Sequence, residues 1–167
     1  MTQSLITPIQ GELSRDHTLS RERVEQIQSA LLDLPQADVA RTDHYFQGGM
    51  YCRRMWIPQG VLIAGKIHKT DHLFIGCQGE LVIWGEGPRY LLKPGDIRKS
   101  PKGTKRIVYS LSDCVVLTLH KSEEKPLDEL EKDMVEDDPD SAFDMNNRLK
   151  PGFLEDREAR RLVCLTG

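Results

Sequence analysis

Several patterns that would identify a common class of protein are missing from this sequence. The four cysteines, Cys52, Cys77, Cys114 and Cys164, lie far apart and form no Cys-x-x-Cys pair. This spacing excludes zinc ribbons and thioredoxin-type redox sites, and we expect reduced thiols. No apolar run approaches the ~20 residues that a membrane helix needs. Lysine and arginine total 23 against 26 acidic residues, so we expect neither a membrane nor a nucleic-acid polymer as partner.

Other absences concern catalysis and export. No glycine-rich loop follows a strand and opens a helix, which disfavours nucleotide-loop folds. No nucleophile-elbow motif of a serine hydrolase is present. Residues 1–10 lack a basic stretch followed by an apolar stretch, so we expect a cytoplasmic protein. A chain of 167 residues with 38% hydrophobic and 29% charged residues suits one globular domain with terminal extensions.

The middle of the chain, residues 43–120, has the pattern of an all-β domain. Short runs rich in valine, isoleucine, tyrosine and tryptophan alternate with glycine and proline breakers. This pattern predicts an antiparallel sandwich or barrel. The predicted strands span residues 50–57, 61–68, 72–75, 80–84, 89–92, 96–99, 105–110 and 114–120.

The flanking segments, residues 1–42 and 121–167, favour helices. Ser20 can cap a helix that runs to about Asp33, with an apolar face that includes Val24 and Ile27. Pro126 suits the first turn of a second short helix. We expect a loose arm over residues 1–19 and a solvated linker in the charged run 136–140. The tail, residues 153–167, is predicted as a last helix or a docking strap.

Two motifs in the β-rich region have characteristic gaps. Gly60 is followed by five residues, then Lys66-Ile67-His68, three residues, His72, six residues and Gly79. Gly95 is followed by five residues, then Pro101-Lys102-Gly103, two residues, Arg106, three residues and Ser110. In these gaps the chain resembles the two motifs of the cupin superfamily. The resemblance implies an all-β cupin fold, a double-stranded β-helix or jelly-roll barrel, with the flanking helices outside it.

The positions of the cupin metal ligands are altered. A typical cupin binds its metal with two histidines, a glutamate and a third histidine, and the corresponding residues here are Lys66, His68, His72 and Arg106. A lysine must lose its proton to bind a metal, and arginine cannot do so at ordinary pH. Two imidazoles make a thin site, because zinc and iron usually take three or four protein ligands. A third ligand for one divalent transition metal could come from Asp71, His44 or His120.

The same positions favour a cationic pocket. Lys66 and His68 share one face of a strand, and a pocket lined by Lys66, His68, His72, Lys105 and Arg106 suits a carboxylate or a phosphate. A one-residue bulge would exchange the directions of Lys105 and Arg106. Arg53 and Arg54 are predicted as an exposed basic pair.

These observations leave three functions open. The first is binding of a small anionic ligand without catalysis, with sequestration of that ligand as one use, and the sequence favours this hypothesis. The second is a metal-dependent isomerase or oxygenase that uses His68 and His72. The third is a virion or host-interaction scaffold, suggested by the flanking helices and the acidic stretch 123–140. The two histidines could also be ordinary half-buried residues with hydrogen bonds.

A narrower resemblance rests on short segments of the chain. These segments look like small cupin-like proteins encoded by tailed bacteriophages and prophages. The resemblance implies a protein made in the cytoplasm of a bacterial host, and that family has no well-established activity. Because cupins often pair and symmetric dimers are the commonest assemblies, we expect a homodimer. The segments are 34–36, 44–46, 49–51, 65–69 and 103–106.

Overall fold

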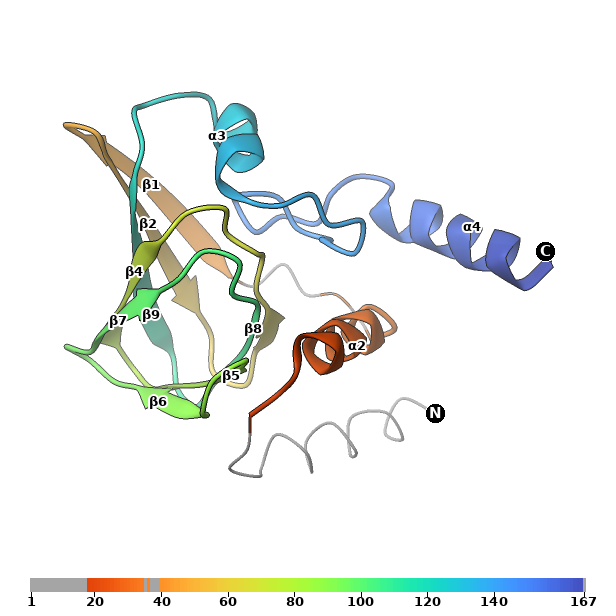
Figure 1. The fold of residues 1–167 in the computed structure, drawn as a ribbon, viewed down its shortest axis with the longest axis horizontal. Coiled ribbons are helices and arrows are strands. Elements are labelled where there is room, and N and C mark those ends of the chain that lie inside the picture. The colour runs from red at the N-terminus through yellow and green to blue at the C-terminus, as the bar shows by residue number, and fades with distance from the viewer. Residues whose placement is uncertain (1–17, 35, 37–39, 167) are drawn as a thin grey trace.

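The protein folds as a two-sheet antiparallel jelly roll with helices on its outside (Figure 1). The computed structural model describes residues 18–34, 36 and 40–166, so most of the predicted N-terminal arm lies outside the described residues. The larger sheet has the order β1 (Arg41–Gln47), β2 (Met50–Ile57), β9 (Cys114–Lys121), β4 (His72–Gln78) and β7 (Ile97–Ser100). The smaller sheet has the order β3 (Leu62–Ala64), β8 (Arg106–Ser110), β5 (Leu81–Gly85) and β6 (Tyr90–Leu92). Jelly rolls of this kind include the cupins, and the predicted fold class is confirmed.

Most strands form where valine and isoleucine runs predict them, with two differences. The structure adds β1, which pairs with β2 along its whole length. The strand predicted over residues 61–68 is shortened to β3, whose last pair is Ala64 with Ile107. The Gly65 amide still donates to the Arg106 carbonyl at 2.8 Å, but β8 begins at Arg106. The residues after Gly65 therefore have no part of β8 opposite them, and the chain turns towards His68.

The space between the sheets has an apolar floor. Alternate residues of each strand point inwards, because side chains of a β-strand alternate between its two faces. We call these buried residues the barrel floor: Ile57, Phe74, Leu81, Ile83, Leu92, Cys114 and Val116.

Helix α2 (Arg21–Leu31) covers the outer face of the smaller sheet. The Ser20 side chain accepts a hydrogen bond from the Arg23 amide, as predicted for the cap. Val24 and Ile27 are buried against outward-facing side chains of the sheet, which include Trp84 and Ile107. The apolar face read from the sequence therefore packs against the barrel.

The C-terminal region folds back over one end of the barrel. It contains α3 (Leu127–Met134), a loop and α4 (Phe153–Thr166), so the helix predicted at Pro126 is confirmed and the tail takes the helical one of its two predicted forms. We call residues 127–149 the cap. Its apolar side chains Leu130, Met134 and Met145 bury Tyr51 of β2 completely. Figure 1 shows α3 above β4 and β8, at the level of the hairpin end of β1 and β2. Among the described residues, no helix is both long enough and apolar enough to cross a membrane.

Backbone hydrogen bonds also fix the cap to the barrel. The Lys69 amide donates to the Met134 carbonyl at 2.8 Å, and the Glu136 amide donates to the Ile67 carbonyl at 2.9 Å. The charged run 136–140 is only partly the solvated linker predicted from the sequence. Its Asp138 accepts hydrogen bonds from Gln28 of α2 and from Lys105, because this segment is held between the helix and the barrel.

Candidate metal centre in the capped end of the barrel

Three histidines meet at the capped end of the barrel. His68 follows β3, His72 begins β4, and His120 lies near the end of β9. Each can offer one ring nitrogen so that these atoms all lie within 4.8 Å of one another. The ring centroids are 4.3–5.0 Å apart. Such a cluster could hold one divalent transition metal, since imidazole nitrogens are good ligands for these ions.

Strand geometry aims two of these side chains inwards. His72 shares its face of β4 with Phe74, a residue of the barrel floor, and His120 shares its face of β9 with Val116. His68 lies beyond the sheet in a β-bridge with Val135 of the cap. Its carbonyl accepts from the Gly103 amide at 2.8 Å. The two motifs thus meet at His68.

The environment keeps the cluster uncharged at neutral pH. Burial, followed by the neighbouring His72 and His120, lowers the pKa of His68 to about 2. Burial and the charges of His72 and Arg53 lower the pKa of His120 to about 3. Burial is also the main cause that lowers the pKa of His72. Neutral imidazoles are the form that binds metal ions.

The ring nitrogens fit a metal better than a purely structural role. Within the described part of the chain, His68 Nδ1 and both ring nitrogens of His120 are buried without a hydrogen-bond partner. Buried polar atoms are normally paired, so such orphaned atoms need an explanation. His72 Nδ1 has a long contact of 3.4 Å with the Thr70 carbonyl. The cluster therefore contains buried ring nitrogens without partners in residues whose ligand atoms lie within 4.8 Å of one another.

His120 is the histidine that joins the predicted pair. The other two residues considered from the sequence make contacts elsewhere. Asp71 accepts a hydrogen bond from the Lys102 amide at 2.8 Å. His44 contacts the Tyr51 hydroxyl at 2.7 Å and Asn146 at 3.2 Å. The sequence could not place His120 because nothing in the motif spacing links position 120 to positions 68 and 72.

The predicted cationic residues take three different positions. Arg106 points into the barrel and donates to Ser100 Oγ at 2.7 Å, and Ser100 is the cross-strand partner of His72. Lys66 forms an ion pair with Glu131 of the cap.

Lys105 departs from the prediction that it lines the pocket with the histidines. Its side chain is only 2% exposed and pairs with Asp138 at 2.8 Å. Gln28 of α2 also donates to Asp138, so this pair lies on the helix side of the smaller sheet. The reason is the alternation of β8: because Arg106 faces inwards, its neighbour Lys105 faces outwards.

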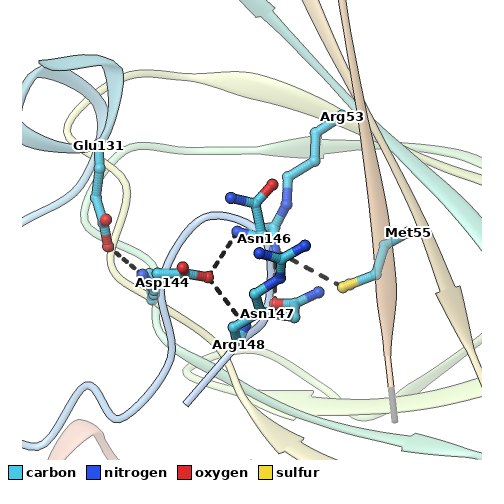
Figure 2. A network of polar contacts seen from close by, with 8 residues as sticks. Arg53, Met55, Glu131, Asp144, Asn146, Asn147 and Arg148 are labelled. Atoms are coloured by element: carbon cyan, nitrogen blue, oxygen red, sulfur yellow. Dashed lines mark hydrogen bonds and ion pairs between the residues drawn. The ribbon is translucent and has the colours of Figure 1, made fainter. Parts of the chain in front are cut away.

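Arg53 is the cationic residue that sequence reasoning missed. We predicted an exposed pair with Arg54, but the Arg53 guanidinium lies inside the barrel. It donates to Asn147 Oδ1 at 2.8 Å and contacts Met55 Sδ at 3.9 Å (Figure 2). Its charge helps to lower the pKa values of His68 and His120, after the larger effect of burial. The available signal was its position between the buried Tyr51 and Ile57 at alternate residues of β2.

A surface depression borders one histidine of the cluster. It has a volume of about 400 Å³, and its wall includes His72. The outward-facing Leu73 and Lys99 also line it, so it opens on the outside of the larger sheet, while the cap covers the end. The full lining is Asp71, His72, Leu73, Lys99, Ser100, Pro101 and Leu119.

Comparisons with known proteins return similar folds but no matching family. No protein-family model and no curated protein matches the chain. KdgF from Halomonas sp. is 17% identical, with 55% of this chain and 86% of that protein aligned at a TM-score of 0.47. A cupin superfamily protein from Desulfitobacterium hafniense is 17% identical, with 65% and 99% aligned and a TM-score of 0.45. A cupin-2 domain protein from Shewanella frigidimarina is 16% identical, with 57% and 91% aligned and a TM-score of 0.42.

These likenesses concern the fold alone. The assignment of a cupin-type jelly roll rests on the strand pairing and on the spacing of the two motifs. The resemblance to phage and prophage proteins stays a prediction.

Proposed function

We propose that this chain is a metal-binding cupin barrel that takes a small anionic ligand at its three-histidine centre. The observation that carries the proposal is the convergence of three histidines, two buried and one half-buried, whose ring nitrogens include unpaired atoms. His68, His72 and His120 would hold one divalent transition metal. Such an ion would supply a Lewis acid that polarises a ligand oxygen. Three protein ligands leave coordination positions for that ligand.

Charge balance supports an anionic ligand. The three histidines bring no negative charge to offset a divalent ion. Arg53 and Arg106 add positive charge beside the cluster, as their effects on the histidine pKa values indicate. Uncompensated buried charge is costly, and arginine pairs well with carboxylates and phosphates. A carboxylate or phosphate would offset both the metal and the guanidinium groups.

This proposal changes the order of the sequence-based hypotheses. The metal, for which the sequence left the third ligand open among Asp71, His44 and His120, now comes first, and the anionic ligand is kept as its partner in the site. Isomerase or oxygenase chemistry, a scaffold role, a dimer and a cytoplasmic location stay predictions.

Elemental analysis of tag-free protein, purified without chelator, tests the proposal. We expect about one transition metal per chain, or stoichiometric Co²⁺ binding after addition, since the site offers three imidazoles. The variant His120→Asn should lose this metal. The matched control, His44→Asn, removes a histidine outside the cluster and should keep it. A wild-type protein that binds no metal after supplementation with Zn²⁺, Mn²⁺, Fe²⁺ or Co²⁺ would refute the proposal.

A further inference from the structure

The cap supplies its own partners to the cationic groups at the end of the barrel. Lys66 is paired with the Glu131 carboxylate of α3, and these side chains are only 17% and 22% exposed. Arg53 donates to the amide oxygen of Asn147, which lies in the loop after α3. Figure 2 shows Glu131 and Asn147 entering from the cap, with Arg53 opposite. The groups suited to an external anion are therefore already in contact with the chain itself.

The loop that presents Asn147 has a defined conformation. The Asp144 carboxylate accepts from the Asn146 amide at 2.8 Å and from the Arg148 amide at 2.9 Å, closing a tight turn (Figure 2). Asn147 itself has a φ of 58°, in the left-handed region that asparagine enters more readily than most residues. Its amide nitrogen donates to Thr42 Oγ1 at 2.6 Å. This turn holds the side-chain amide of Asn147 between Thr42 of β1 and Arg53.

The rear of the cap has a separate attachment. Asp138 accepts from Lys105 at 2.8 Å and from Gln28 at 3.1 Å, and Ala142 packs in a small apolar cluster with Leu32 and Phe153. The pairs made by Glu131 and Asn147 are independent of these contacts. The backbone hydrogen bonds from Lys69 to Met134 and from Glu136 to Ile67 also hold the cap, as does the packing of α3 on Tyr51. Separation of Glu131 from Lys66 therefore calls for movement of the Glu131 side chain and not of the whole cap.

We infer that the Glu131 carboxylate is an internal competitor for the anionic ligand, and that ligand binding requires its displacement from Lys66. The inference rests on the proposed function, since it names the regulation of the same site. While Glu131 neutralises Lys66, the lysine offers little net positive charge to a second carboxylate, so the internal pair reduces the apparent affinity for the ligand. Ligand binding and the release of Glu131 are then coupled, and the coupling acts in both directions.

Isothermal titration of malonate into the metal-loaded, full-length protein tests this competition. Glu131→Gln keeps the shape of the side chain but removes its charge, and we expect malonate to bind more tightly by a factor on the order of 10. The matched control is Glu129→Gln, an exposed position on the same helix, which should leave the affinity unchanged. In the Glu131→Gln background, Lys66→Met should abolish the gain.

Hydrogen exchange of the wild-type protein gives a second measurement that does not depend on a variant folding. Malonate should speed the exchange of α3 amides, because it breaks the ion pair between Glu131 and Lys66 that helps to hold this helix on the barrel. Equal malonate affinities for wild type and Glu131→Gln, no binding by either, or binding with unchanged exchange in α3 would overturn the inference. The metal titration of the wild-type protein reports separately on the proposed function. The same malonate titrations on chelator-treated protein test the competition between Glu131 and malonate even if no metal binds.

Discussion

The two ends of the barrel interior are formed by the same strands, but their inward side chains differ in polarity. On β2, the inward residues are Tyr51 and Arg53 at the capped end, and Met55 and Ile57 at the floor. On β9, His120 and Thr118 give way to Val116 and Cys114, and on β4, His72 gives way to Phe74. The floor is apolar and closely packed. The capped end is polar and contains buried atoms without partners in the described chain, which include Thr118 Oγ1 and Arg53 Nε.

The comparison separates stability from binding. Burial of apolar side chains stabilises the floor, and each large side chain there contributes ~2 kcal/mol or more. Buried polar atoms without partners cost free energy, because they lose their hydrogen bonds to water. The floor therefore provides much of the stability of the barrel, and the unpaired groups at the capped end agree with the ligand site proposed above.

The largest effect should come from a cavity in the floor. Ile83 is 1% exposed, and Ile83→Ala should lower the free energy of unfolding by about 2–5 kcal/mol, through lost burial and an unfilled cavity. Urea denaturation measures this change. The control Ile97→Ala alters a side chain that is 63% exposed and should have little effect. If both variants lost the same stability, the floor would not be the stabilising end.

An effect of intermediate size should come from the histidines of the capped end, which should make the free energy of unfolding fall in acid. Since the pKa values of His68 and His120 are lowered to about 2 and about 3, the unfolded chain takes up their protons first. Their contribution to stability is complete above pH ~6.5 and is lost as the pH falls towards the folded values. Each histidine should lower the unfolding free energy by up to ~1.4 kcal/mol per pH unit.

Urea unfolding of chelator-treated protein between pH 7 and pH 5 measures this slope before most carboxylates titrate. His120→Asn should make the slope shallower by one histidine's share, whereas Ile83→Ala should shift the whole curve without changing its slope. An unchanged slope in His120→Asn would mean that this histidine is not held neutral by burial.

The smallest effect separates two neighbouring arginines. Arg54 is 43% exposed and lies 3.7 Å from Asp43, and such surface pairs contribute about 0–1 kcal/mol. We expect Arg54→Ala to change neither stability measurably nor malonate binding. Arg53→Ala should weaken malonate binding on the order of tenfold, because it removes a guanidinium beside the site. Titration calorimetry measures the malonate affinity of both variants. Similar affinities for Arg53→Ala and Arg54→Ala would show that Arg53 does not contact the anion.

The sequence by itself determined the fold class and most of the secondary structure, although β1 was missed and β3 is shorter than predicted. Strands form where β-branched and aromatic runs stand between glycine and proline breakers, and Ser20 starts its helix as capping requires. The motif gaps placed His68 and His72 together. These features depend on local conformation and on spacing within short segments, which a single chain displays directly.

Only the tertiary structure decided which distant residues complete the site. Alternation along a strand gives the relative faces of Lys105 and Arg106, but the pairing of β8 with β5 and the packing of α2 decide which face is inside. His120 reaches His72 because β9 pairs with β4. Glu131 reaches Lys66 because the cap folds back over the barrel. Contacts between distant strands and between the cap and the barrel depend on the packing of the whole chain. They therefore cannot be predicted from short segments of the sequence.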